Sequence, residues 1–222
     1  MPFPNNPTGA IMEKEDLKEI AKVCVEKDIF VLSDEIYSEL TYKDKHVSIA
    51  SMPGMKERTV VINGFSKSYA MTGWRIGYTG SSKEIAKMMG SVQSHQTSNP
   101  NSIAQKAAVE ALTGPQDSVE KMHAEFDKRR KYMYKRICDM DLLDALEPMG
   151  AFYVFVDGSA VLGKSYKGTK IESVPQMADI LINEYNTAIV PCADFGFPDC
   201  FRLSYAISIE QIEKGLDRIE SF

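Results

Sequence analysis

The chain has 222 residues, which is enough for one large domain or two smaller ones. Hydrophobic residues make up 44% of it and charged residues 26%, a composition that excludes a disordered or fibrous protein. The 26 basic and 31 acidic residues give a net charge of −5, and the basic residues are scattered along the chain. This argues against nucleic acid or an anionic membrane as the main partner.

The first half of the chain reads as helices alternating with buried strands. Apolar residues spaced as on one helix face predict a helix over 13–27. Uninterrupted apolar runs predict strands at 29–32 and 60–62, covered on both faces as in a mostly parallel sheet. A third strand is expected at 75–80, and helices at 82–95 and 101–113, before Gly114-Pro115 breaks the pattern.

The second half has a different organisation. A long charged amphipathic segment from 117 to 139 predicts a helix that leads from one domain to the next. Beyond it, strands are expected near 152–156, 188–190 and 201–205, and helices near 175–186 and 208–220. We therefore expect an α/β portion over 1–117 and an interdomain helix with a smaller α+β domain over 118–222.

The chain shows no signal for a membrane, a leader or a metal. No apolar run approaches the roughly 18 residues of a membrane helix, and residues 1–5 lack a leader pattern, so we expect a cytoplasmic protein. The cysteines show no Cys-x-x-Cys spacing, and the three histidines lie near none of them, which predicts reduced thiols without a metal or a disulfide framework. They are Cys24, Cys138, Cys192 and Cys200.

Two of the apolar strands lead directly into polar residues. The first ends in Ser33-Asp34-Glu35 and the second in Asn63-Gly64-Phe65-Ser66-Lys67. Open α/β sheets place ligand chemistry at the carboxyl ends of their strands. These two segments are therefore the first candidates for a functional site.

Taken singly, each candidate residue has two interpretations. Asp34 either caps a following helix or pairs with a cation or hydrogen-bond donors. Lys67 is either solvated or chemically active, and Arg75 and Arg202, each in a predicted strand, need a carboxylate side chain or an anionic ligand. The segment Asn5-Asn6-Pro7-Thr8-Gly9 is by itself typical of an ordinary turn.

Taken together, four segments resemble the class I aminotransferases, which are pyridoxal-phosphate enzymes of fold type I. Their order along the chain is Asn5-Asn6-Pro7-Thr8-Gly9, Ser33-Asp34-Glu35-Ile36-Tyr37, the block from Gly64 to Tyr78, and Phe201-Arg202-Leu203-Ser204-Tyr205-Ala206. The block around Lys67 looks most like the bacterial aspartate aminotransferases. The resemblance runs from about Pro4 to the C-terminus.

The resemblance implies roles for the residues nearest the cofactor. Lys67 matches the lysine that forms the Schiff base with pyridoxal 5′-phosphate and then moves the substrate proton. Asp34 matches the aspartate that keeps the pyridine nitrogen protonated. Asn6 and Tyr37 match the two residues that hydrogen-bond the phenolic oxygen of the cofactor.

It also implies how phosphate and substrate are held. Ser66 and Arg75 match phosphate ligands, and Arg202 matches the arginine that binds the α-carboxylate of the substrate. Asn6 is a second candidate for substrate binding. Ala151-Phe152-Tyr153 looks like the small-domain strand of the family, but a plain buried aromatic strand is the better explanation of these residues. A homodimer is implied by the resemblance alone.

The sequence departs from the family in length. Residues that stack on the pyridine ring and a glycine-rich phosphate loop belong to a first half that this sequence does not show, so we expect the C-terminal portion of an aminotransferase. Apolar strands left uncovered by that half invite aggregation, and we expect weak or absent turnover by this chain alone. Cys192 stands where the family usually has glycine, which leaves the placement of Arg202 less determined.

Three functions are compatible with these residues. The first is amino-group exchange between an amino acid and a 2-oxo acid. The second keeps the cofactor and breaks another bond, as in a C–S lyase, because a fold does not fix a reaction. The third is an inert remnant or interaction module that keeps the motif by descent. The identity of the amino acid and of the 2-oxo acid stays open.

Overall fold

The computed structural model describes residues 1–222, and the chain forms two compact units. Unit 1 consists of residues 1–5 and 10–122, and unit 2 of residues 6–9 and 123–222. The division lies inside the long helix α4 (Asp117–Cys138), whereas the sequence pattern placed it at the start of that helix. Residues 6–9 belong to unit 2 although the chain on both sides of them belongs to unit 1.

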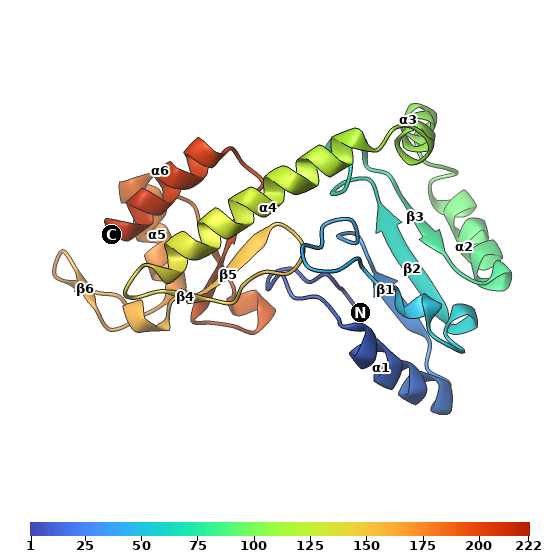
Figure 1. The fold of residues 1–222 in the computed structure, drawn as a ribbon, viewed down its shortest axis with the longest axis horizontal. Coiled ribbons are helices and arrows are strands. Elements are labelled where there is room, and N and C mark those ends of the chain that lie inside the picture. Colours follow the sequence, from blue (N-terminus) through green and yellow to red (C-terminus); the bar gives the residue numbers. More distant parts are fainter. The chain divides into compact units, whose positions relative to one another are not determined.

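Unit 1 is an α/β unit built around a three-stranded sheet with the order β1-β2-β3 (Figure 1). β1 runs parallel to β2, and β3 runs antiparallel to β2. The strands are β1 (Val31–Asp34), β2 (Thr59–Gly64) and β3 (Gly77–Gly80). The helices are α1 (Lys14–Glu26), α2 (Lys83–Gln96) and α3 (Ser102–Thr113), with short 3-10 turns η1 (Ile49–Ser51), η2 (Lys56–Arg58) and η3 (Thr72–Trp74).

Only one face of β1 is covered. Val31 and Ser33 are buried, whereas Leu32 is 62% exposed. The prediction of a strand covered on both faces is therefore wrong for this chain, and β1 begins two residues later than expected, so that Ile29 and Phe30 precede it and are exposed. The covered face packs on one hydrophobic cluster, formed by Leu17, Ala21 and Cys24 of α1 with Val31, Ile49, Met52 and Met55.

Two glycines allow β2 and β3 to approach closely just before the Lys67 segment. Gly64 and Gly77 are paired across the antiparallel ladder. A Cβ on Gly77 would lie 2.9 Å from the carbonyl oxygen of Asn63, and one on Gly64 would lie 3.1 Å from the Cα of Gly77. A side chain at either position would push the strands apart where β2 leads into the Lys67 segment.

Unit 2 contains a four-stranded antiparallel sheet with the order β4-β5-β9-β8, and a separate hairpin of β6 and β7 (Figure 1). The sheet strands are β4 (Asp144–Ala145), β5 (Tyr153–Asp157), β8 (Val190–Pro191) and β9 (Cys200–Ser204), and the hairpin strands are β6 (Ser165–Tyr166) and β7 (Thr169–Lys170). The remaining elements are α5 (Val174–Tyr185), α6 (Ile209–Glu220), η4 (Ser159–Val161) and η5 (Ala193–Phe195).

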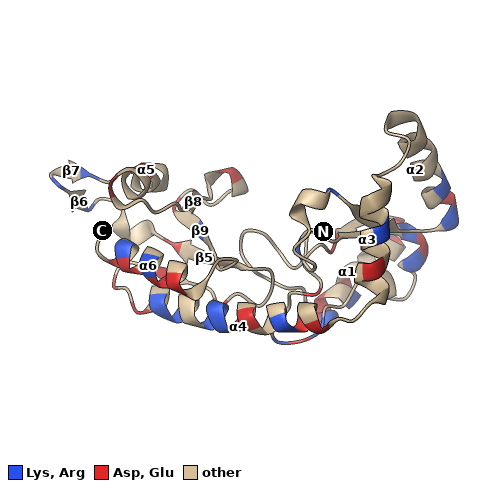
Figure 2. Cartoon of the chain, turned by 90° about the horizontal axis from the view of Figure 1, so that it is seen from above, with Lys and Arg blue, Asp and Glu red and all other residues tan.

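Helices bury one stripe each in unit 2. In α6 the buried residues are Ile212, Leu216 and Ile219, which lie on one helical face. In α4, Phe126, Met133 and Ile137 are buried. Its acidic residues all lie at or before Asp127, and every charged residue from Lys128 onward is basic (Figure 2). One basic residue of α4, Arg130, is also buried, and it pairs with Asp127 and Glu147. No helix in the chain is both long enough and apolar enough to span a membrane.

Candidate active site

A tight turn after β2 carries Lys67. The turn is held by backbone hydrogen bonds in which the Phe65 carbonyl accepts from the amides of Tyr69 and Met71. Phe65 is 2% exposed, and its ring packs against those of Tyr69 and Tyr78, each with its centroid 5.6 Å away. The Lys67 side chain is half-buried, and its Nζ lies 5.7 Å from the centre of the Tyr37 ring.

The segment at the end of β1 carries Asp34 and Tyr37, and Tyr37 is the residue that Lys67 contacts. Asp34 ends the strand and is exposed, and its Oδ1 accepts a hydrogen bond of 3.2 Å from the amide of Ile36. A turn over 36–39 follows, so Asp34 caps a turn and not the helix that was one interpretation of the sequence. Tyr37, within that turn, is 6% exposed.

Arg75 lies outside the sheet, which corrects the prediction that it opens a strand. Its backbone is left-handed, with φ of 51°, and it ends η3, while β3 begins only at Gly77. The guanidinium is exposed and donates from Nη1 to the carbonyl oxygen of Thr72 at 2.8 Å. A non-glycine residue in this conformation costs about 1 to 2 kcal/mol, and Arg75 is one of seven such residues in the chain.

The surroundings of Arg75 leave room for a ligand. An open pocket of about 580 Å³ adjoins its side chain. Ser66 lies close in sequence, in the Lys67 turn, and is half-buried. The pocket is lined by Ala70, Gly73, Trp74, Arg75, Asn101 and Ala104.

In unit 2, the structure brings together Asn6 and Arg202. Arg202 is the central residue of β9, as predicted, and its Nη1 donates to the Asn6 Oδ1 at 2.5 Å. Its guanidinium lies 4.4 Å from the centre of the Tyr153 ring and 6.0 Å from that of Phe195. The polar partner of this arginine is thus a neutral amide, and two aromatic rings flank its charge.

Gly9 anchors the segment that carries Asn6. Its carbonyl oxygen accepts hydrogen bonds from the amides of Met149 and Gly150, at 2.9 and 2.8 Å. Its φ is +69°, and a Cβ there would lie 2.6 Å from the Cβ of Pro148. Glycine is therefore required both by the backbone conformation and by the close contact. Through these contacts of Gly9, the turn predicted at 5–9 keeps residues 6–9 in unit 2.

Two cysteines border the loop next to Arg202. The Cys192 amide donates to the Cys200 carbonyl at 2.9 Å, which continues the pairing of β8 with β9. Burial raises the pKa of the Cys192 thiol to about 11, so the thiol stays protonated at neutral pH. The substitution of the usual glycine by Cys192 leaves Arg202 in the middle of β9.

Sequence reasoning missed the aromatic flank of Arg202. From the sequence, Tyr153 is better explained as part of a plain buried aromatic strand, and Phe195 is not a candidate. In the ladder, Phe155 is opposite Arg202 and Tyr153 is opposite Ser204, so alternation places Tyr153 on the Arg202 face of the sheet. That register could have been anticipated from the two strand patterns. The position of the Phe195 ring next to the Arg202 guanidinium could not.

The residues predicted from the sequence thus form two groups, one in each unit. Unit 1 holds Asp34, Tyr37, Ser66, Lys67 and Arg75, and within it the contact shown is that of Lys67 with Tyr37. Unit 2 holds Asn6 and Arg202, which are hydrogen-bonded.

Residues 2–219 match the family model described as aminotransferase class I and II. The chain is 42% identical over 221 residues to an aspartate aminotransferase of Bacillus subtilis, covering 99% of this chain and 55% of that protein. It is also 42% identical over 224 residues to a probable N-acetyl-LL-diaminopimelate aminotransferase of the same species, covering all of this chain and 54% of that protein. The chain therefore spans about half the length of the curated relatives it matches.

Solved structures agree. The aspartate aminotransferase of Rhizobium meliloti superposes with a TM-score of 0.95 at 38% identity, covering 100% of this chain and 56% of that one. An aromatic aminotransferase of Pyrococcus horikoshii gives 0.90 at 38% identity, covering 99% and 58%. With its fold and motifs both matched, this chain belongs to the class I and II aminotransferases and has part of their fold type I architecture.

Proposed function

We propose that this chain is the part of a pyridoxal-phosphate-dependent aminotransferase that carries the cofactor lysine and the substrate arginine. The observation that carries the proposal is the position of the Lys67 amine, 5.7 Å from the Tyr37 ring at the carboxyl ends of β1 and β2. This is the edge of an α/β sheet where ligands bind. Membership of the family supports the same reading.

The donor set of unit 1 fits the functional groups of pyridoxal 5′-phosphate. The Asp34 carboxylate would hold the pyridine nitrogen, and its Oδ1 is already oriented by the amide of Ile36. The Tyr37 hydroxyl would bind the phenolic oxygen, and Ser66 and Arg75 the phosphate, for which a guanidinium is well suited. Lys67 would bind the aldehyde carbon. When bound, the cofactor supplies an electron sink for the substrate Cα.

The chain's own residues would then carry out three tasks. The Lys67 amine moves a proton to and from the substrate Cα. The Arg202 guanidinium binds the substrate α-carboxylate and so orients the Cα–H bond. Asn6, whose Oδ1 accepts from Arg202, helps to orient the guanidinium, and we assign it to both the cofactor-binding and the substrate-binding groups of our proposal.

The proposed substrates are an amino acid and a 2-oxo acid. The relatives carry names for aspartate, for N-acetyl-LL-diaminopimelate and for aromatic substrates, so similarity leaves the side-chain preference open. The working form we propose is a cytoplasmic homodimer, on the family resemblance. Asp34 and Arg75 are exposed to water in this chain, and we therefore expect weak turnover by the chain alone.

Covalent uptake of the cofactor tests the proposal. The chain is incubated with pyridoxal phosphate, reduced with borohydride, digested, and analysed by mass spectrometry. We expect the modification on the peptide that contains Lys67 and its loss in Lys67→Ala, whereas Lys106→Ala, which removes an exposed lysine of α3, retains it. Equal labelling of several lysines, or labelling of Lys67→Ala at the level of the wild type, would contradict the proposal.

Product analysis then separates the reactions. An aminotransferase forms a new amino acid from a 2-oxo acid, whereas a C–S lyase splits cystathionine, with one water, into the thiol homocysteine, pyruvate and ammonia. An inert remnant gives neither product, and it shows no visible imine absorbance on addition of the cofactor.

A further inference from the structure

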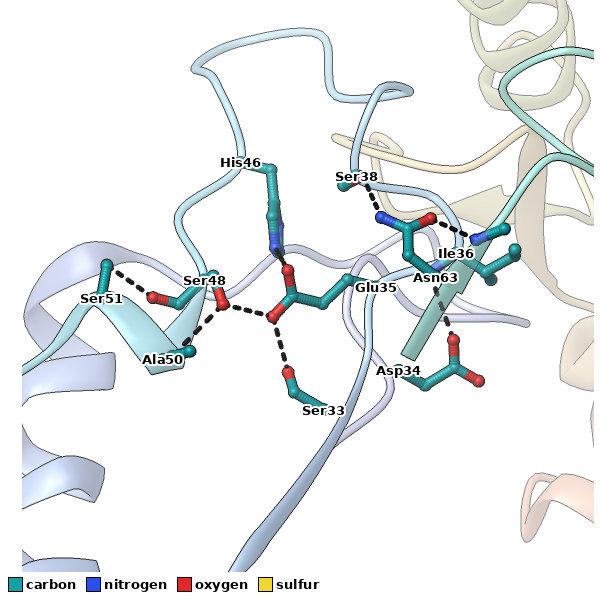
Figure 3. Close-up of polar contacts among 11 residues, drawn as sticks. Ser33, Asp34, Glu35, Ile36, Ser38, His46, Ser48, Ala50, Ser51 and Asn63 are labelled. Carbon is teal, nitrogen blue, oxygen red and sulfur yellow. Dashed lines mark hydrogen bonds and ion pairs between the residues drawn. The ribbon is translucent and has the colours of Figure 1, made fainter. Parts of the chain in front are cut away.

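A buried carboxylate, that of Glu35, lies next to the residues of the proposed cofactor site. Glu35 follows Asp34, and because side chains alternate along a strand, the two point to opposite faces (Figure 3). Asp34 is exposed, whereas Glu35, the residue after β1, is 4% exposed and so continues the alternation that buries Val31 and Ser33. Glu35 has no role in the reaction proposed above.

Three side chains satisfy this carboxylate (Figure 3). The hydroxyls of Ser33 and Ser48 donate to its Oε1 at 2.9 and 2.6 Å, and the His46 Nε2 lies 2.9 Å from its Oε2. Burial by itself raises the pKa of the Glu35 carboxyl, but these contacts from His46, Ser48 and Ser33 outweigh it, so the pKa lies below its ordinary value. The group is therefore a carboxylate at neutral pH.

The contacts tie the end of β1 to a distant loop. His46 and Ser48 lie on the segment that leads into η1, and Ser48 caps this turn by accepting from the amide of Ala50 at 3.2 Å. Its carbonyl oxygen also accepts from the Ser51 hydroxyl at 2.7 Å. The loop is thus itself ordered at the point where it meets Glu35.

The backbone of Glu35 is fixed as well. Its amide donates to the Ile62 carbonyl of β2 at 2.8 Å, and its carbonyl accepts from the Ser38 amide at 2.9 Å. The second bond closes the turn that contains Tyr37. Glu35 is therefore held at both its main chain and its side chain, between the two residues that we assign to the pyridine nitrogen and the phenolic oxygen.

We propose that Glu35 is a positioning residue, which, through His46, Ser33 and Ser48, fixes residues 34–38 so that Asp34 and Tyr37 face the cofactor. The inference rests on the proposed function. A buried charge of this kind adds little net stability compared with an apolar replacement, because removing it from water is costly. A geometric role explains why a carboxylate occupies this position.

The amide of Ile36 offers a direct readout, because it donates to the Asp34 Oδ1 and so reports the orientation of that carboxylate. Hydrogen exchange on the chain without cofactor is measured for Ile36, for Ser38 and for the amides of α1. In Glu35→Ala we expect exchange at Ile36 and Ser38 to accelerate about tenfold or more while α1 is unchanged. Glu35→Gln, which keeps one acceptor oxygen, should restore part of the protection.

Ser51→Ala is the matched control, because it removes a hydrogen bond from the same loop without touching Glu35. It should leave Ile36 and Ser38 protected. Unchanged exchange at these two amides in Glu35→Ala, or a rise equal to that of α1, would overturn the inference. If Glu35→Ala does not fold, the same exchange measurement is made on Ser48→Ala and Glu35→Gln. Unchanged exchange at Ile36 and Ser38 in both variants would overturn the inference.

Cofactor uptake at Lys67 gives the second readout. We expect uptake by Glu35→Ala to be about 10- to 100-fold weaker than by the wild type, the range seen when partners that orient metal ligands are removed. Uptake at the wild-type level, with Ile36 exposed to exchange, would overturn the positioning role. If the wild-type chain takes up no cofactor, the proposed function fails, and the exchange data still decide whether Glu35 fixes residues 34–38.

Discussion

The guanidinium of Arg202 and the amide of Asn6, 196 positions apart in the sequence, are joined by a hydrogen bond of 2.5 Å. An arginine in the middle of an apolar strand needs an anion to balance its charge, yet the polar partner shown here is neutral. The charge is flanked by the Tyr153 ring at 4.4 Å, which lowers the local polarity around it. This leaves the guanidinium able to bind a carboxylate.

Arg202→Lys tests this capacity. Lysine keeps the positive charge but loses the planar fork that binds a carboxylate with two hydrogen bonds. We expect the affinity for a 2-oxo acid, measured by calorimetric titration, to fall about tenfold or more, equivalent to about 1.4 kcal/mol. Arg218→Lys, at a half-buried arginine of α6 whose Nη1 donates to the Asn186 carbonyl oxygen, serves as the control and should bind as the wild type does. Equal affinities of the wild type and both variants would show that Arg202 does not bind the 2-oxo acid.

Gly9→Ala should destabilise unit 2. The left-handed φ of +69° and the 2.6 Å approach to Pro148 both oppose a side chain, and we expect the free energy of unfolding to fall by about 2 to 4 kcal/mol. Gly215→Ala is the control, since a Cβ there meets nothing within 4 Å inside a helix, and it should be neutral or stabilising by about 1 kcal/mol. Urea unfolding of both variants measures the difference. Similar stabilities would show that residues 6–9 are not anchored as described.

The Glu35 carboxylate predicts an acid-dependent stability. Its pKa is lowered in the folded chain from an ordinary value of 4.5, so its contribution is complete above that value and disappears as the pH falls through the lower folded pKa. The difference in unfolding free energy between wild type and Glu35→Gln should therefore change as the pH falls below about 4.5. A difference that stays constant down to pH 3 would mean that the carboxylate is not stabilised by its partners.

Much of the fold follows from local sequence patterns. The helix predicted over 13–27 is α1, and the long charged helix predicted from 117 to 139 is α4, because an amphipathic repeat depends only on neighbouring residues. The error at β1 has a physical cause. An apolar run indicates a strand without stating which faces are covered, and in this chain Leu32 has no cover.

The site is predicted less completely than the fold. Motif residues such as Lys67 and Arg202 stand out in the sequence because charged groups next to apolar strands are unusual. The left-handed backbone of Arg75 and the Glu35–His46 contact leave no such trace. The Glu35–His46 contact depends on how the loop that carries His46 folds back, and neither spacing nor composition encodes that contact.

The uncovered face of β1 predicts how the chain behaves in solution. Leu32 is 62% exposed and Val31 7% exposed, although the two are neighbours on one strand. An exposed apolar strand favours association between chains, so Leu32→Thr should raise the concentration at which the chain aggregates, measured by light scattering, and leave the free energy of unfolding within about 0.5 kcal/mol of the wild type. Val31→Thr places a hydroxyl of nearly the same size in the α1 cluster and should cost about 1 to 3 kcal/mol without reducing aggregation. Equal effects of the two substitutions would mean that both faces of β1 are covered in solution, by self-association of the chain.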